Sequence, residues 1–554
     1  MNKKVCSFPI LFALLALLIG TCAVVFPASA QAAPTATGSI TVSGTVARSY
    51  DAYRIFSANV VDGDSDAKIA TDLAWASDAV RDAALPVLHS AGMPNSQTTA
   101  QEAAEWLNAD SHLTSALSAQ LARSLQNSGA VFEALKAGTA AELPCGYWLI
   151  VADDDAIAQN EAGTAPIMVL VGGGAVTVKP KAATPKVSKH VLEDGTAAWQ
   201  KAADATVGDD LYWRLSATVP AGLSAYDTYA VQLVDTMSAG LDPSKVAESM
   251  RVYVAAGAEG GFDAVPAGKD GRAGTEPAKG WTDITAQCVV SVEGSSFTVR
   301  TGDLIAALCG ADAFTAGARV VAVYNAPLNS ACNHGIAKGN PNEVYLRYPR
   351  SPFADQSGDA GFTRTPSDDA CAYTWDLALT KRGSDGDKPL AGAVLSITDD
   401  RGRTLAADGA WDAEGKATVT TGDDGRVTVS CVDSGKLEVR ELKAPKGYTA
   451  FEGTRSVTVK AEGLDVDQVA AAKPKLAITA ESPLRADSAD GSTGSLEASL
   501  INTPTGTPPS ITTGGFMPST GDMAMYAAAA AAVAGAALIV VALLVKRGGG
   551  SHKE

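Results

Sequence analysis

The sequence predicts a mainly β protein built from tandem β-sandwich domains, preceded by a mixed domain in which helices are inserted beside a sheet. Three observations support this fold class. Short segments of alternating polar and apolar residues recur through most of the 554 residues and indicate half-buried strands. Glycine and proline, 53 and 26 residues, punctuate these segments as turns. A helical pattern is confined to residues 99–125.

Composition and spacing exclude several classes of function. The net charge of −17, without a basic cluster, excludes nucleic-acid binding. The cysteines show no CxxC spacing and the five histidines are scattered, so we expect neither a metal site nor a cofactor. Asp62, Asp64 and Asp66 alternate as calcium ligands do, but the glycine and distal glutamate of a calcium loop are missing. No G-x-S-x-G or similar motif indicates a hydrolase, and we do not expect an enzyme.

The N-terminus has the pattern of a secretory signal peptide over residues 1–30. Two lysines precede an apolar stretch at residues 10–25, and Ala28, Ser29 and Ala30 form a small-x-small cleavage site. The mature chain is therefore expected to begin near Gln31, outside the cytoplasmic membrane.

The C-terminus combines a short motif, an apolar segment and a basic end. Met-Pro-Ser-Thr-Gly at residues 517–521 precedes the uncharged segment 523–545, which is long enough to span a bilayer, and the basic tail 546–554. This order resembles the LPXTG-type sorting signal of Gram-positive cell-wall proteins, with methionine in place of the usual leucine. The resemblance implies that a sortase cleaves between Thr520 and Gly521, and that the precursor spans the membrane before it is anchored to the cell wall. A plain membrane anchor is the alternative.

Residues 31–182 are expected to form the mixed domain. Thr99 and Glu102 form a capping box at the start of a helix, and residues 112–125 form a second amphipathic run. Strands are predicted on either side, at residues 40–46, 50–56, 147–151 and 167–171. The segments GSITVSGTV, YDAYRIF and GYWLIVAD resemble the N-terminal domain of backbone pilins from sortase-assembled fimbriae.

This domain ends in the sequence Val-Thr-Val-Lys-Pro-Lys at residues 176–181, which is similar to the V-x-V-Y-P-K pilin motif, with Lys179 at the tyrosine position. In a strand, the two valines face one side and Lys181 faces the other, where solvent can reach it. The resemblance implies that Lys181 is the intersubunit linkage site that receives the carboxyl group released by sortase. Lys179 and Lys186 are neighbouring competitors.

Residues 183–355 are expected to form a β-sandwich with three polar residues on its apolar side. Lys189, Asp235 and Asn342 each share strand parity with apolar residues and should point into the core. Buried charges are costly unless they are paired or consumed by a reaction. KVSKHV, VDTMSAGL and GNPNEVYLRY resemble the middle pilin domain, in which a first-strand lysine and a last-strand asparagine form an isopeptide bond beside an acid. Asn340 is a rival acceptor.

Residues 368–505 repeat this arrangement with Lys381, Glu441 and Asn502 on the apolar parity of their strands. The segments TKRGSDGDKPLAGAVLSI, LEVRELKAPKGY and SLINTP resemble a collagen-adhesin B-type (CnaB) immunoglobulin-like domain. The resemblance implies an isopeptide bond between Lys381 and Asn502. Residues 506–516, rich in Thr, Pro, Gly and Ser, read as a spacer.

The chemistry of such a bond requires a neutral lysine, a carboxamide and a proton donor held in contact. Burial lowers the pKa of lysine and raises that of a carboxylic acid, so Asp235 and Glu441 are the expected catalytic acids of autocatalytic closure. Each molecule reacts once with itself. The alternative is a buried ion pair hydrogen-bonded to asparagine, without a covalent bond.

Six cysteines remain after removal of the signal peptide. Cys371 and Cys431 are the disulfide candidates, because they fall within one predicted domain in an oxidising compartment. Cys145 is alone in its domain.

Taken together, these features predict a major shaft pilin that is secreted and anchored to the cell wall of a Gram-positive bacterium. Its implied partners are sortase, identical subunits and peptidoglycan, while minor pilins and a host ligand stay open. The alternative is a monomeric wall-anchored adhesin, which would not need Lys181.

Overall fold

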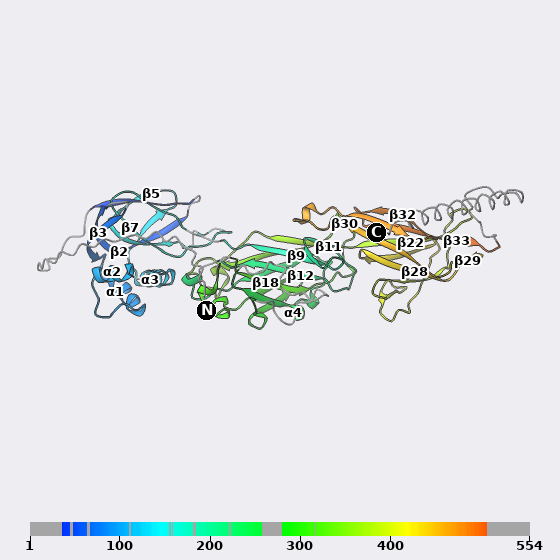
Figure 1. Ribbon diagram of the computed structural model, residues 1–554, viewed down its shortest axis with the longest axis horizontal. Coiled ribbons are helices and arrows are strands. Elements are labelled where there is room, and N and C mark those ends of the chain that lie inside the picture. Colours follow the sequence, from blue (N-terminus) through cyan, green and yellow to red (C-terminus); the bar gives the residue numbers. More distant parts are fainter. Residues whose placement is uncertain are drawn as a thin grey trace, which may run out of the picture.

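The computed structural model describes residues 36–44, 48–63, 67–109, 112–153, 157, 159–180, 184–220, 223–257, 280–315 and 317–506. These residues form three β-rich domains in a row along the long axis, and the longer helices accompany the first domain (Figure 1). The predicted fold class, tandem β domains after a mixed N-terminal domain, is confirmed.

The first domain contains two sheets, with strand orders β5-β1-β8 and β3-β2-β6-β7, and β4 pairs with β2. Its core lies between these sheets and on the helical side of the larger one. The strands are β1 (Thr37–Val42), β2 (Ser49–Asp62), β3 (Lys68–Trp75), β4 (Glu133–Lys136), β5 (Ala140–Pro144), β6 (Gly146–Ala152), β7 (Ile167–Val171) and β8 (Val176–Val178).

Three helices, α1 (Asp78–Ser90), α2 (Ala100–Asn108) and α3 (Ser115–Ser128), lie along the larger sheet (Figure 1). The capping box predicted at Thr99 is present, because the Thr99 hydroxyl accepts from the Glu102 N–H and the Glu102 carboxylate accepts from the Thr99 N–H. Helix α1 was not predicted.

The second domain is a sandwich of two sheets with orders β10-β9-β12-β18-β14-β15 and β11-β21-β19-β13-β17-β16, and β20 pairs with β19. Its strands are β9 (Val187–Glu193), β10 (Ala198–Gln200), β11 (Ala202–Asp204), β12 (Tyr212–Thr218), β13 (Gln232–Met237), β14 (Arg251–Ala255), β15 (Trp281–Asp283), β16 (Val289–Glu293), β17 (Ser296–Arg300), β18 (Arg319–Asn325), β19 (Asn340–Pro349), β20 (Phe362–Arg364) and β21 (Asp368–Tyr373). Two short helices, α4 (Val246–Ser249) and α5 (Leu304–Ala307), lie between strands.

The third domain is a second sandwich, with orders β27-β22-β33-β29 and β25-β24-β23-β28-β30-β31, while β32 pairs with β33 and β26 with β23. Its strands are β22 (Trp375–Gly383), β23 (Val394–Thr398), β24 (Thr404–Leu405), β25 (Trp411–Asp412), β26 (Val419–Thr420), β27 (Arg426–Val432), β28 (Gly435–Lys443), β29 (Tyr448–Thr449), β30 (Thr454–Glu462), β31 (Lys475–Ala480), β32 (Leu484–Asp490) and β33 (Ser495–Pro504).

The boundary between the second and third domains differs from the prediction. Strand β21 was assigned to the third domain, but it pairs with β19 and β11 of the second. The third domain therefore starts at Trp375, and Asn342 on β19 is not on the last strand of the second domain. The sequence signal was ambiguous because β21 and β22 follow one another with only Thr374 between them.

Polar contacts fix both joints between domains. At the first joint, Gly163 N–H donates to the Arg350 carbonyl over 2.7 Å, and Tyr348 hydroxyl donates to the Glu161 carbonyl over 3.0 Å. At the second, the Arg403 guanidinium binds both carboxylate oxygens of Asp209, at 2.5 and 2.8 Å. Bidentate pairs of this kind define an orientation as well as a contact.

The expected signal peptide, sorting motif, membrane segment and basic tail lie outside the described residues, as do Lys181, Asp64 and Asp66. Within the described ranges, no helix has the length and apolar character needed to cross a membrane.

Replacing Thr99 by alanine removes the cap of α2 and should lower the free energy of unfolding of the first domain by about 1 kcal/mol. Denaturant titration combined with hydrogen exchange of residues 100–108 would measure the loss. Ser96→Ala in the same loop, where the residue is exposed, is the matched control. Equal stability of the two variants would contradict a capping role.

Candidate functional site

In the third domain, Lys381, Glu441 and Asn502 meet in the core. All three side chains are buried. The Lys381 ammonium donates to Asn502 Oδ1 and lies 3.1 Å from Glu441 Oε1. Asn502 Nδ2 donates to the same Glu441 oxygen over 2.8 Å. The carboxylate thus contacts both the amine and the amide nitrogen.

The strand pattern explains this convergence. Strands β22 and β33 pair in parallel, with Lys381 opposite Leu500, so Lys381 and Asn502 lie on adjacent strands of one sheet. Glu441 approaches from β28 in the facing sheet. The inward orientation predicted from alternation is confirmed, since Lys381, Glu441 and Asn502 are buried together with the apolar residues of the same parity.

Burial determines how readily Lys381 loses its proton. Removal from water lowers the pKa of Lys381 to about 8, against the opposing effect of the nearby Glu441 carboxylate. Glu441 is held from its other side, because Oε2 accepts from the Phe451 N–H over 3.0 Å. The amine therefore loses its proton far more readily than an exposed lysine.

In the second domain, Lys189, Asp235 and Asn342 are fully buried and gather around a fourth residue, Tyr324. The Lys189 ammonium donates to Asp235 Oδ2 and, over 2.8 Å, to the Tyr324 hydroxyl oxygen. Asn342 Nδ2 donates to the same oxygen over 2.8 Å, and the Tyr324 hydroxyl donates to Asp235 Oδ2 over 3.1 Å. Tyr324 thus connects the amine to the amide.

This second cluster bridges the two sheets of its domain. Lys189 lies on β9 and Tyr324 on β18 of one sheet, whereas Asp235 and Asn342 lie on the neighbouring strands β13 and β19 of the other. Sequence reasoning missed Tyr324 because an aromatic residue on an apolar strand reads as core. Its parity with Val320 and Ala322 was the available signal.

Burial also shifts the pKa values of the ionisable groups in this second cluster. Burial lowers the pKa of Lys189 to about 8, opposed by Asp235. Burial raises the pKa of Asp235, opposed by Lys189 and by the Tyr324 hydrogen bond. Burial also raises the pKa of Tyr324 well above its usual value, so this hydroxyl stays protonated.

The two candidate acceptor asparagines have different surroundings. Asn340 is occupied at both ends of its amide, since Oδ1 accepts from Asn333 N–H over 2.8 Å and Nδ2 donates to the Asn333 and Ala372 carbonyls. Asn342 Oδ1 is buried without a hydrogen-bond partner among the described residues. The carbonyl group left open to reaction is that of Asn342.

The backbone of Lys189 is held by a further pair that sequence reasoning missed. Lys189 N–H donates to Asp368 Oδ2 over 2.6 Å, and the Lys201 ammonium contacts the same oxygen and donates to the Lys189 carbonyl over 2.8 Å. Asp368 lies on β21, the strand that the sequence placed in the next domain. This pair fixes the strand that carries the amine.

The segment before Lys181 has the predicted orientation. Strand β8 pairs in parallel with β1, Val178 is buried, and Thr177 and Lys179 are exposed. Lys181 itself is outside the described residues, so its accessibility stays a prediction.

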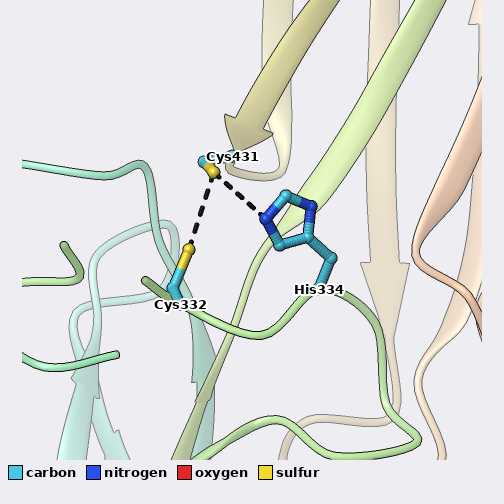
Figure 2. Close-up of side chains that lie close together, drawn as sticks. All are labelled: Cys332, His334 and Cys431. Atoms are coloured by element: carbon cyan, nitrogen blue, oxygen red, sulfur yellow. Dashed lines mark hydrogen bonds between the residues drawn. The ribbon is translucent and has the colours of Figure 1, made fainter. Parts of the chain in front are cut away.

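The cysteine pairing predicted from sequence is wrong. Cys371 is a buried free thiol on β21 of the second domain, and its partner candidate Cys431 lies instead 3.5 Å from Cys332, sulfur to sulfur. His334 Nε2 is 3.4 Å from the Cys431 sulfur (Figure 2). The expectation that no metal ligands converge therefore also needs correction, because the fold brings Cys431 to Cys332 and His334 from about 100 residues further along the sequence.

Comparison with known proteins gives one domain match and several wider likenesses. Residues 376–473 match the SpaA prealbumin-like fold domain. A stretch of 143 residues is 30% identical to the trypsin-resistant surface T6 protein of Streptococcus pyogenes serotype M6. This alignment covers 24% of either chain, so the chain matches about a quarter of that relative's length.

Two solved structures are similar along most of the chain. The T6 backbone pilin of serotype M6 Streptococcus pyogenes covers 86% of this chain and 100% of its own, with 17% identity and a TM-score of 0.47. The full-length major pilin SpaD from Corynebacterium diphtheriae covers 86% and 100%, with 15% identity and a TM-score of 0.42. The resemblance to Gram-positive backbone pilins predicted from the motifs is confirmed as a resemblance.

The lowered pKa of Lys381 predicts a pH dependence in a variant whose lysine stays free. In Asn502→Ala, the unfolded chain binds a proton between about pH 8 and 10.5 that the folded chain does not. The free energy of unfolding should therefore rise with pH across this window, by up to about 3 kcal/mol. Urea titrations at several pH values would measure the slope.

The matched control for this slope is the double variant Lys381→Met, Asn502→Ala, which keeps every other group that titrates in the same range. In this double variant the free energy of unfolding should rise less steeply with pH, because the contribution of the Lys381 amine is absent. Identical slopes in both variants would contradict a lowered lysine pKa.

Proposed function

We propose that this protein is the major shaft subunit of a covalently polymerised surface pilus, stabilised by one Lys-Asn isopeptide bond in each of its second and third domains. The observation that carries the proposal is the contact of Lys381 with Asn502 beside a shared carboxylate in a closed core. The alignment with the T6 surface protein and the pilin-like motifs support the same function.

The reaction in the third domain is an exchange of one amide nitrogen for another. The neutral Lys381 amine attacks Cγ of Asn502, a new C–N bond forms, and the bond to Nδ2 breaks. One proton passes from the lysine nitrogen to Nδ2, and ammonia leaves. Glu441 Oε1 contacts both nitrogens and is placed to carry this proton between them.

The second domain uses an additional group for the same transfer. Asp235 contacts the Lys189 nitrogen, whereas the Tyr324 hydroxyl oxygen contacts both the Lys189 nitrogen and the Asn342 amide nitrogen. We assign to Asp235 the acceptance of the lysine proton and to Tyr324 its relay to the leaving nitrogen. In this scheme the phenol gives one proton and recovers another, so it ends unchanged.

The polymerisation step depends on the predicted termini. Sortase would cleave after Thr520, and the carboxyl group would be joined to Lys181 of the next subunit, with the last subunit fixed to peptidoglycan. Exposed Lys179 at the end of β8 supports a position of this motif on the protein surface. The isopeptide chemistry is a single self-reaction, so the chain needs no cofactor and is not an enzyme in this proposal.

The intact mass of the extracytoplasmic chain, residues 31–515, expressed without sortase, tests the internal bonds. Two closures release two molecules of ammonia, so the mass should be about 34 Da below the sequence value, and Lys381→Ala should restore about 17 Da of this deficit beyond its own mass change. Lys388→Ala, which changes an exposed lysine, should leave the deficit intact. A full sequence mass in the unmodified protein would contradict covalent closure and leave buried ion pairs.

Replacing Lys181 by alanine in the native host tests polymerisation. We expect the ladder of high-mass species in cell-wall extracts to disappear and the monomer to remain anchored, because the acceptor amine is lost. Lys179→Ala and Lys186→Ala serve as controls and should keep the ladder. A ladder that persists without Lys181 would contradict this assignment, and a wild type without any ladder would favour the monomeric adhesin.

A further inference from the structure

Three metal-ligating side chains meet at the joint between the second and third domains. Cys332 and His334 come from the loop between β18 and β19, and Cys431 comes from β27 (Figure 2). Their sulfur and nitrogen atoms all lie within 4.8 Å of one another. Neither crosslink cluster includes any of these residues.

The loop that carries Cys332 and His334 is docked against the third domain. Gly335 N–H donates to the Thr374 carbonyl over 3.1 Å, and Ile336 N–H donates to the Gly491 carbonyl over 3.2 Å. A Cβ atom at Gly335 would lie 2.6 Å from the Gly494 backbone nitrogen, so only glycine permits this approach. His334 is therefore held against the domain that supplies the third ligand.

Cys431 is placed by a local break in strand pairing. The register of β22 with β27 shifts between Trp375 and Leu377, and Cys431 has a left-handed φ of 56°. Bulges of this kind redirect one side chain out of the regular alternation, and a left-handed non-glycine residue is unfavourable. Here the sulfur is directed to Cys332 and His334.

Asp376, on β22 of the third domain, orients both His334 and Cys431. Its Oδ2 is 2.5 Å from His334 Nδ1, and its Oδ1 accepts from the Cys431 N–H over 3.0 Å. With the Nδ1 proton donated to Asp376, the Nε2 lone pair faces the two sulfurs. A carboxylate behind a ligating histidine is the usual support of zinc sites.

We propose that Cys332, His334 and Cys431 bind a zinc-class divalent ion that ties the second domain to the third. A tetrahedral zinc ion requires about 3.8 Å between two sulfurs and about 3.5 Å between sulfur and nitrogen. The observed 3.5 and 3.4 Å are close to these separations. Two thiols lose their protons on binding, the resulting thiolates balance the ion's charge, and water completes the fourth position.

The same geometry argues against a disulfide as the resting state. A disulfide requires about 2.05 Å between sulfurs, so the two thiols would have to approach by about 1.5 Å, and two electrons would have to pass to an oxidant. It would also give no role to His334 or to the Asp376 carboxylate behind it. Sulfur and imidazole ligands favour zinc over calcium or magnesium.

Titration of the reduced, metal-free extracytoplasmic chain with Co²⁺ and Zn²⁺ tests the site. We expect one ion per chain by native mass spectrometry, a thiolate-to-cobalt charge-transfer band, its loss when Zn²⁺ is added, and a higher melting temperature with Zn²⁺. Cys332→Ser, Cys431→Ser and His334→Ala should abolish the band. Asp376→Asn should weaken binding about 10- to 100-fold through the histidine.

The control is Cys309→Ser, which changes an exposed thiol outside the cluster and should bind the ion like the wild type. Metal content and free thiols of the protein isolated from the bacterial surface form the second arm, where we expect bound zinc and no bond between Cys332 and Cys431. Absence of the charge-transfer band in the reduced protein, or a Cys332–Cys431 disulfide without metal in the native protein, would overturn the proposal. Neither arm depends on polymerisation.

Discussion

The proposed chemistry of this chain depends on the burial of two lysine side chains. Lys189 and Lys381 are fully enclosed in the cores of their sandwiches, where an ion loses its hydration and a single neighbouring carboxylate does not fully compensate for it. Burial therefore shifts both groups towards the neutral amine. The neutral Lys381 amine contacts its carboxamide directly, and Tyr324 connects Lys189 to Asn342. The burial that is unfavourable for a lysine ion in folding thus also makes the proposed reaction possible. Closing a loop of about 120 residues in the third domain and of about 150 residues in the second would stabilise each fold by about 5 kcal/mol by the disulfide analogy.

The two clusters differ in what their bonds would join. Lys381 and Asn502 lie on adjacent parallel strands of one sheet, β22 and β33, which carry the start and end of the third domain. A bond there would carry tension directly from one end of the domain to the other. Lys189 and Asn342 lie on opposite sheets, so their bond would hold the sandwich together face to face. Strand β21 comes after β19 and β20 in the chain and stays outside that bond, and it is held by the ladder to β19 and by the ion pair of Asp368 with Lys201.

Much of this arrangement could be predicted from the sequence because strand alternation is a local property. The parity of Lys381 with Trp375, or of Asp235 with Leu233, requires no knowledge of the partner strand. The groups that alternation does not single out were missed. In the sequence, Tyr324 is indistinguishable from an ordinary core aromatic residue. Asp368 was assigned to the wrong domain because β21 and β22 follow one another without a turn. The approach of Cys332 to Cys431 depends on how two domains dock, and no local pattern encodes that distance.

The joints between domains pose a mechanical problem that the proposed isopeptide bonds do not solve. A bond within a domain leaves the neighbouring domain free to tilt, so the joint is only as rigid as its own contacts. The second joint combines the Arg403 pair with Asp209, the Trp375 indole donating to Asp204 over 2.6 Å, and the loop that carries His334. These contacts are non-covalent, and the Trp375 and Asp209 contacts are buried or part-buried, so they orient the two domains without linking them covalently. The proposed ion, held by ligands from both domains, would resist their separation and would therefore add at this joint what bonds within each domain do not supply.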